Sequence, residues 1–471
     1  MNITELTALL ALASIALFVI GLKRLSRVRT ARSGNALMAA GMLLAVVITL
    51  LEIGLVDYRW IIGGLALGGA IGVAIVVRAQ ATEMPEIVAR FNGFGGAASA
   101  FVALSLFWIE VVQSPTDATA ATVLGGTAGT TLVLSVLIGA VTLSGSIFAE
   151  LKLRGTLSHN PRVPGRTVVM GALVVAGLGL GGVAVFAVEE AALAAALVLG
   201  LVLASLLAGV VLVLPIGGAD MPVVISLLNS LSGLAAAAAG FALTNQLLII
   251  AGTIVGAAGL ILTQIMCVAM NRSLVNVIAG SFGEGGDVEH GEYGHVVAAD
   301  PESAAMVLEA AGSVIIVPGY GLAAARAQNA AHDLAKALIE RGVEVRFAIH
   351  PVAGRMPGHM NVVLAEAEVP YELLYEMDAI NAEFSSTDVA IVVGANDVVN
   401  PAANDTPGSP IAGMPILEVE HARQVFVIKR SLSPGYAGIK NELFERDHTA
   451  MLYGDAKQVL TDLTAELQAA G

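Results

Sequence analysis

The stretch SVIIVPGYGLAA, residues 313–324, decides the fold of the last third of this chain. A run of β-branched residues typical of a buried strand passes into a glycine-rich turn, and a helical pattern follows. The turn Gly319-Tyr320-Gly321, with Ala324 after it, fits the Gly-x-Gly-x-x-Gly/Ala fingerprint. In that fingerprint the first glycine permits a tight turn and the second lets the backbone approach a pyrophosphate. The sequence therefore predicts a dinucleotide site at Gly319 and Gly321.

Strand and helix patterns alternate on both sides of this stretch. The β-branched runs are Ser313–Val317, Val343–Ile349, Asp388–Val393, Gln424–Lys429 and Ala450–Tyr453. Helical patterns lie between or after them, as at Leu322–Arg341 and Asp455–Gln468. Such alternation is typical of a doubly wound, Rossmann-like parallel α/β sheet. We predict that fold for this part of the chain.

The loops that follow the predicted strands are rich in Gly, Asn, Asp and Arg. They are the segments 352–361, 394–401, 413–414 and 435–438. Ligands of doubly wound sheets bind outside the carboxyl ends of the strands, and a purely structural domain would have shorter turns. We therefore expect the ligand to lie against these loops.

Two strand ends favour NADP over NAD as that ligand. The strand Val343–Ile349 ends in His350 and lacks the acid that usually holds the ribose 2′-hydroxyl of NAD. Lys429, Arg430 and Ser431 close another strand, and two cations can hold a 2′-phosphate by charge-assisted hydrogen bonds. The alternative for Lys429 and Arg430 is a solvated strand end.

The first 270 residues have the composition of a membrane domain. The chain is 56% hydrophobic and only 13% charged, against roughly 25% charged in soluble domains. A spanning helix needs about 20 apolar residues, and we count nine candidate segments. They begin near Thr4, Asn35, Trp60, Glu86, Ala121, Thr167, Ala191, Pro222 and Leu247. We predict an α-helical membrane bundle over residues 1–270, a solvated linker over 271–302 and the nucleotide domain over 303–471.

Charge and cysteine content exclude several other classes of protein. A net charge of −14 argues against nucleic acid as a partner, because a phosphate backbone needs a basic stripe. The single cysteine, Cys267, excludes internal disulfides and cysteine-rich metal sites. The run Thr4–Leu22 has no basic region before it, so it reads as a spanning helix and not as a signal peptide.

Basic residues in short loops predict the orientation. Clusters follow the first segment and the fifth, whereas the alternate loops hold almost none, with Arg59 the main exception. The clusters are Lys23, Arg24, Arg27, Arg29 and Arg32, and Lys152, Arg154, Arg162 and Arg166. We therefore expect a multi-pass protein of the cytoplasmic (inner) membrane, with the N-terminus outside and the C-terminal domain in the cytoplasm.

Four polar groups in the membrane part carry information because such groups are expensive there. Asn92 falls in the fourth segment and Asn229 in the eighth, while Asp220 precedes the eighth and Arg272 follows the ninth. Each asparagine could lie on a proton path or form an interhelical hydrogen bond that only joins two helices. Asp220 and Arg272 could pair with each other or with the soluble domain.

Several long motifs make the chain recognisable. They are TEMPE at 82–86, GGADMPVV at 217–224, MNRS at 270–273, and the loops of the soluble part named above. With these motifs the sequence resembles, over essentially its whole length, the beta subunit of the proton-translocating NAD(P) transhydrogenases.

The resemblance implies an activity, a cofactor and a partner. The soluble domain would bind NADP(H), and an alpha subunit of one or two polypeptides would supply the NAD(H)-binding domain and further helices. Hydride would pass directly between the two nicotinamides while a proton crosses the membrane, and we expect a dimer of alpha-beta units. The implied NADP(H) contacts are Tyr320, Val352, Ala353, Gly354, Arg355, Met356, Pro357, Gly394, Ala395, Asn396, Asp397, Val398, Gly413, Met414, Lys429, Arg430, Ser431, Leu432, Ser433, Pro434, Gly435, Tyr436, Asp455 and Ala456.

One departure from the family concerns the proton path. Some members carry a histidine where this chain has Asn92, and no predicted span of this chain contains a histidine. Because asparagine does not titrate, we expect the titrating group to come from the partner, with Asn92 and Asn229 orienting it or its water. The alternative is a buried water chain that ends at Asp220. Asp220, Arg272 and Asp397 are candidate relays to the cofactor; the alternative for Asp397 is a turn-forming role.

Two rival functions remain open from the sequence. A transporter or channel regulated by an NADP-sensing domain would share the architecture, but it would not explain such elaborate nucleotide loops. An NADP-dependent dehydrogenase of a small substrate would need a second soluble domain and an acid or base that this sequence lacks.

Overall fold

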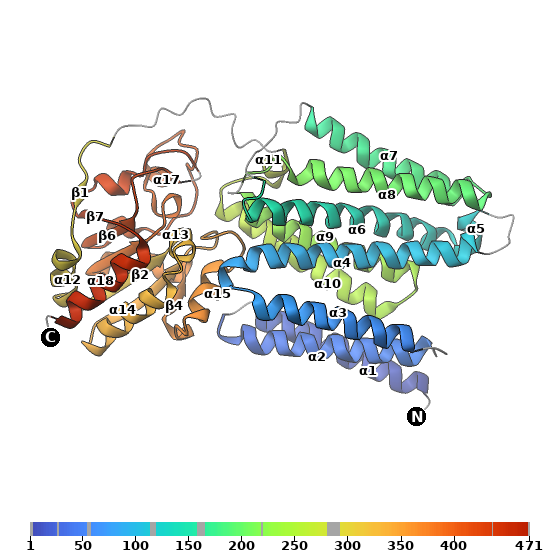
Figure 1. Ribbon diagram of the computed structural model, residues 1–471, viewed down its shortest axis with the longest axis horizontal. Coiled ribbons are helices and arrows are strands. Elements are labelled where there is room, and N and C mark those ends of the chain that lie inside the picture. Colours follow the sequence, from blue (N-terminus) through green and yellow to red (C-terminus); the bar gives the residue numbers. More distant parts are fainter. Residues whose placement is uncertain are drawn as a thin grey trace. The chain divides into compact units, whose positions relative to one another are not determined.

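The chain divides into two compact units. In the computed structural model one unit comprises Met1–Pro215 and Val224–Leu262, and the other comprises Ile216–Val223 and Thr263–Gly471. The structure describes residues 3–25, 28–53, 58–113, 119–157, 165–217, 220–279, 293–435 and 437–469. Figure 1 shows long helices in the first half of the chain and a mixed sheet-and-helix domain in the last third.

Nine helices in the described part of the chain are long and apolar enough to cross a membrane, which confirms the predicted number. They are α1 (Ile3–Leu25), α2 (Val28–Ile53), α3 (Arg59–Arg78), α4 (Met84–Phe107), α6 (Gly126–Leu153), α7 (Arg166–Phe186), α8 (Ala191–Val213), α9 (Met221–Ala242) and α10 (Gln246–Ala269).

Two boundaries differ from the prediction. Helix α2 begins at Val28 and not near Asn35, so Arg32 lies on a helix where the sequence predicted a loop. The fifth span begins at Gly126, because a short helix α5 (Ala120–Leu124) ends at Gly125, whose φ of +86° breaks the helix. Hydrophobic runs locate such spans well, but backbone conformation sets their ends.

Small residues bring α4 and α6 into close contact. A Cβ added to Gly96 would lie 2.7 Å from the carbonyl oxygen of Gly139, and a Cβ on Gly139 would overlap the carbonyl oxygen of Gly96. Close backbone approach of this kind drives helix association in lipid. The small residues of α9 do the same against α10, where a Cβ on Gly252 would reach the backbone of Gly233. These glycines of α4, α6, α9 and α10 therefore face a neighbouring helix.

The last third of the chain contains a seven-stranded sheet in the order β1-β7-β6-β5-β2-β3-β4, with every described pair parallel. The strands are β1 (Val297–Ala298), β2 (Ser313–Pro318), β3 (Glu344–Ile349), β4 (Leu374–Glu376), β5 (Val389–Val393), β6 (Gln424–Lys429) and β7 (Thr449–Tyr453). The predicted parallel sheet is confirmed. Two short edge strands were not predicted, and one of them, β1, lies within the segment predicted as linker.

The strand order reverses between β2 and β5. From this point β3 and β4 extend to one side and β5, β6 and β7 to the other, as in other doubly wound sheets. Helices α12 (Pro301–Glu309) and α14 (Gln328–Glu340) both pack against α18 (Ala456–Ala469). The carboxyl ends of β2 and β5 therefore lie side by side at the position where such sheets bind ligands.

The predicted helix Leu322–Arg341 is wrong as a single element. The structure has a five-residue helix α13 (Tyr320–Ala324) and then α14, separated at Arg326, whose φ is +51°. The amide of Ala327 donates to the carbonyl of Leu322 at 3.0 Å and closes the intervening turn. The glycine turn thus opens a single helical turn, which contributes little helix dipole to an anion site.

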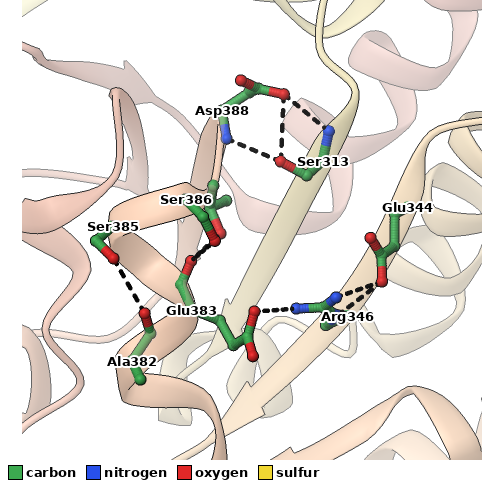
Figure 2. Close-up of polar contacts among 9 residues, drawn as sticks. Ser313, Glu344, Arg346, Ala382, Glu383, Ser385, Ser386 and Asp388 are labelled. Atoms are coloured by element: carbon green, nitrogen blue, oxygen red, sulfur yellow. Dashed lines mark hydrogen bonds and ion pairs between the residues drawn. The ribbon is translucent and has the colours of Figure 1, made fainter.

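Charged groups join the amino ends of the strands (Figure 2). Asp388, just before β5, accepts hydrogen bonds from the amides of Gly312 (2.9 Å) and Ser313 (3.0 Å), and Arg423 donates to it at 2.8 Å. Figure 2 shows the contacts between Asp388 and Ser313. The amide of Gly312, then the Ser313 donors and the Arg423 charge, lower the pKa of Asp388 below its usual value. The amino ends of the strands lie opposite the edge where we expect the ligand. The charges here therefore stabilise the sheet.

The α4–α6 contact makes a prediction about membrane-domain stability. Gly139→Ala should destabilise the chain by about 1–3 kcal/mol, because the new methyl group meets the backbone of α4. Gly179→Ala is the matched control, since a Cβ there meets nothing within 4 Å. Thermal unfolding of the detergent-purified chain measures both. Equal unfolding temperatures for the two variants would contradict the close contact.

Candidate nucleotide site and polar groups of the membrane helices

The turns after β2 and β5 touch through their backbones. The amide of Gly319 donates to the carbonyl of Val393, and that of Gly321 to the carbonyl of Gly394, both at 2.9 Å. A Cβ on Gly321 would lie 2.6 Å from the Cα of Gly394, which itself has a φ of +64°. The structure therefore explains these glycines by contact between two loops. Their predicted role at a pyrophosphate stays a prediction.

A cation and an aromatic ring from different loops meet beside this turn. The guanidinium carbon of Arg355 lies 4.4 Å from the centre of the Tyr320 ring, which is 37% exposed. Such stacking holds a guanidinium in place without neutralising it. Val352, Ala353 and Met356, in the same loop as Arg355, are buried and anchor it. The loop after β2 supplies the Tyr320 ring and the loop after β3 supplies Arg355, so the two loops together hold one guanidinium in place.

Asp397 joins the loop after β5 to the loop after β6. The carboxylate is 2% exposed, and its Oδ2 accepts from the amide of Ala437 at 3.1 Å. A Cβ on Gly435 would lie 2.6 Å from its Cγ, so glycine is needed there. The side chain of Asn396 donates to the carbonyl of Ser433 at 3.2 Å. Two separately predicted loops are therefore brought together, although Tyr436 lies outside the described residues.

The predicted cations at the end of β6 differ in their surroundings. Lys429 is half-buried, its Nζ donates to the carbonyl of Ser433 at 2.9 Å, and it lies 5.1 Å from the Phe444 ring. Burial lowers the pKa of Lys429 to about 8, against the opposing effect of the Asp397 charge. Arg430 is exposed. Lys429 is thus held in place near the Asp397 charge, whereas Arg430 is open to solvent.

The remaining predicted contacts lie around this group. Ser431 and Ser433 share a hydroxyl–hydroxyl hydrogen bond of 2.9 Å in the segment that also holds Leu432 and Pro434. The amide of Gly454 donates to the carbonyl of Lys429 at 3.1 Å, which places the start of α18 beside that lysine.

Asp455, Ala456, Gly413 and Met414 have local roles in the structure. Asp455 accepts from the amide of Lys457 at 3.1 Å, and Ala456 is the first residue of α18. Gly413 has a φ of +76°, and Met414 is buried.

Four buried residues of this edge were not named as individual contacts, although Asn400 and His359 lie within the predicted loops. Asn441 donates to the backbone oxygen of Asn396 at 3.0 Å and to its side-chain oxygen at 3.1 Å. Asn400 donates to the carbonyl of Lys440 at 3.0 Å. His350 and His359 are each 1% exposed. The position of His350 at the end of a predicted strand could have identified it, whereas nothing in the local sequence distinguishes Asn441.

Asn92 and Asn229 differ in the contacts that their side chains make. In α4, Asn92 is buried, and its Nδ2 donates to the carbonyl of Ile225 in α9 at 3.2 Å. This is an interhelical hydrogen bond, the alternative given above, and it ties Asn92 to the helix that carries Asn229. Asn229 is half-buried, and its backbone carbonyl accepts a hydrogen bond from the Ser232 hydroxyl at 2.7 Å.

Asp220 and Arg272 form an ion pair, one of the two pairings that the sequence left open. One Arg272 nitrogen lies 3.1 Å from Oδ1 and 3.0 Å from Oδ2 of Asp220. Asp220 is 1% exposed and Arg272 is 19% exposed. A pair this buried is costly to break from one side, because the remaining charge would be left without compensation.

The fold and these loops define a class: multi-pass membrane proteins with a parallel α/β domain whose loops at the carboxyl ends of the strands are rich in glycine and basic residues. No group of three potential metal ligands occurs among the described residues. A sequence profile of the family described as NAD(P) transhydrogenase beta subunit matches residues 7–466.

Two relatives, both described as NAD(P) transhydrogenase subunit beta and both from Rhodospirillum rubrum, are 46% identical over 450 residues. The match covers 94% of this chain and 95% of each relative. The chain belongs to the NAD(P) transhydrogenase beta-subunit family.

The lowered pKa of Lys429 makes a prediction about NADPH affinity. Below pH 8 the ammonium is charged, and above it the charge is lost, while the 2′-phosphate stays ionised throughout. The dissociation constant for NADPH should therefore rise above pH 8, by up to about tenfold per pH unit.

Lys429→Arg is the matched control, because a guanidinium remains charged over this range. NADPH fluorescence titrations at pH 7 to 10 measure both proteins. A flat profile in the unmodified chain, or the same rise in the arginine variant, would place the 2′-phosphate elsewhere.

Proposed function

We propose that the chain is the NADP(H)-binding, membrane-embedded beta subunit of a proton-pumping NAD(P) transhydrogenase. It would couple hydride transfer between NAD(H), on an alpha partner, and NADP(H) to proton translocation. The proposal rests on one observation in a chain of this family. The loops that hold Arg355, Asp397 and Lys429 meet at one edge of a doubly wound sheet. The proposed domains are residues 1–270, 271–302 and 303–471.

The residues at this edge fit NADP(H) by their chemistry. Three cations, Arg355, Lys429 and Arg430, suit a ligand with a pyrophosphate and a 2′-phosphate. The turns at Gly319 and Gly394 lie at this edge in backbone contact with each other. Lys429 and Arg430 would hold the 2′-phosphate, and Arg355, held on Tyr320, would face the pyrophosphate. The other predicted contacts would complete the site.

The proposed reaction needs positioning more than it needs acid or base groups. When bound, NADP(H) supplies the hydride chemistry, and the rings of the two nucleotides must approach to about 3–3.5 Å with water excluded. Asp397, buried between two loops, would lie beside the nicotinamide. The loops held by Asn396 and Asn441 would keep that region rigid.

Proton movement would drive the reaction by a population shift. The NAD and NADP couples have nearly equal potentials, so an uncoupled reaction would sit near balance. One proton crossing about 150–200 mV supplies roughly 3.5–4.5 kcal/mol, enough to change a nucleotide ratio by about two to three decades. Protonation must therefore favour one state of the NADP site, with the Asp220–Arg272 pair and Asp397 as relays.

A partner subunit would supply the titrating group of the proton path. Asn92 already donates to the Ile225 carbonyl and cannot titrate. The titrating group would come from helices of the alpha subunit, which would have one or two polypeptides, in a dimer of alpha-beta units. The N-terminus would lie outside the inner membrane and the soluble domain in the cytoplasm.

The test is reconstitution with the alpha partner in sealed vesicles. We expect NADPH to reduce an NAD analogue and the vesicle interior to change pH in the same assay. A transporter or channel with an NADP-sensing domain would instead bind NADPH without hydride exchange in the presence of any partner. That result would overturn the proposal.

A substitution at Asp397 tests its coupling role. Asp397→Asn should keep the loop contact to the Ala437 amide but remove the titrating charge. We expect hydride exchange to fall by at least tenfold and the pH dependence of NADPH release to flatten. Asp333→Asn, at an exposed position on α14, is the control. If both properties survive in Asp397→Asn, the residue is only a turn former.

A further inference from the structure

A buried histidine stands behind the Arg355 loop. His359 is the first residue of α15 (His359–Glu366) and is 1% exposed. Its Nδ1 accepts a hydrogen bond from the amide of Arg355 at 3.0 Å. An accepting Nδ1 carries no proton, so the neutral ring has its proton on Nε2.

The Nε2 of His359 has no hydrogen-bond partner among the described residues. A buried donor without a partner costs free energy, and such groups are rare in native proteins. Burial, with a smaller contribution from the Arg355 charge, lowers the pKa of His359 to about 4, so the ring is neutral at pH 7.

His350 shows what a satisfied core histidine looks like in the same domain. It is as buried as His359, but both of its ring nitrogens have partners. Nε2 donates to the carbonyl of Pro415 at 2.8 Å, and Nδ1 accepts from the amide of Val352 at 3.2 Å. His350 contributes to core stability, whereas the placement of His359 is not the one that core stability would select.

The loop is shaped around the His359 ring. Gly354 has a φ of +107°, and a Cβ there would lie 2.7 Å from the Cγ of His359. The ring centre of His359 is 6.4 Å from that of Tyr320, on which the Arg355 guanidinium is stacked. The imidazole therefore contacts Gly354 and accepts a hydrogen bond from the amide of Arg355. It also lies beside the Tyr320 ring on which the Arg355 side chain is stacked.

We propose that His359 is a positioning residue for nucleotide binding, which acts by fixing the Arg355 backbone so that the guanidinium stays on Tyr320. This assignment rests on the proposed NADP(H) site. It predicts that loss of the Nδ1 acceptor weakens binding of an anionic nucleotide. Stability is kept, because replacing the imidazole also removes the unpaired Nε2–H donor.

Three variants of the full-length chain in detergent test the assignment. His359→Phe keeps the ring shape and removes both nitrogens, and His359→Asn keeps an acceptor near the Nδ1 position. His350→Phe is the matched control at a satisfied histidine. We expect His359→Phe to raise the dissociation constant for NADPH at least tenfold with an unchanged or higher unfolding temperature. His359→Asn should stay within about threefold of the unmodified chain, and His350→Phe should lower the unfolding temperature.

Two further measurements separate positioning from a structural effect. Hydrogen exchange of the Arg355 amide should be faster in His359→Phe and unchanged in His359→Asn. In a double-mutant cycle, His359→Phe should add nothing to the loss caused by Arg355→Ala.

Three results would overturn the assignment: additive losses in that cycle, unaltered NADPH binding in His359→Phe, or a stability loss in that variant equal to that of His350→Phe. If the unmodified chain binds no NADPH, the proposed function fails and this assignment fails with it.

Discussion

The backbone contact between the turns after β2 and β5 is the constraint on which the soluble domain depends. Parallel pairing of these strands places Gly319 and Gly394 at the same edge, and two amide hydrogen bonds of 2.9 Å join the turns there. The strand order also reverses at this point, which is where doubly wound sheets bind their ligands. The neighbouring loops can then present their cations to one ligand.

The charges at this edge are held in place before any ligand arrives. Arg355 is stacked on an aromatic ring, and Lys429 is half-buried with a backbone carbonyl as its partner. Such prepositioning reduces the entropy that binding must remove. The same burial brings the pKa of Lys429 to about 8. Burial of Lys429 therefore both fixes the position of its ammonium group and makes the charge of that group sensitive to pH.

The membrane helices combine tight packing with a few satisfied polar groups. Glycines let α4 approach α6, and Asn92 reaches a backbone carbonyl on α9. Asp220 and Arg272 neutralise each other. In a medium without water each of these groups needs a partner. In the proposed function these helices would form the scaffold for proton movement, and the partner would supply the titrating group.

The sequence alone determined the nine spans, the parallel sheet and the glycine-rich loops at the carboxyl ends of its strands, because hydrophobic runs and strand–turn patterns are local properties of a chain. It did not predict β1 and β4, which have two and three residues and exist only through their neighbours. Nor did it predict the break at Arg326, where a positive φ interrupts a helical pattern. The hydrogen bonds from Asn441 to Asn396 and from Arg355 to His359 were decided by the tertiary structure. They join atoms whose proximity depends on how the loops fold, and no residue pattern encodes that proximity.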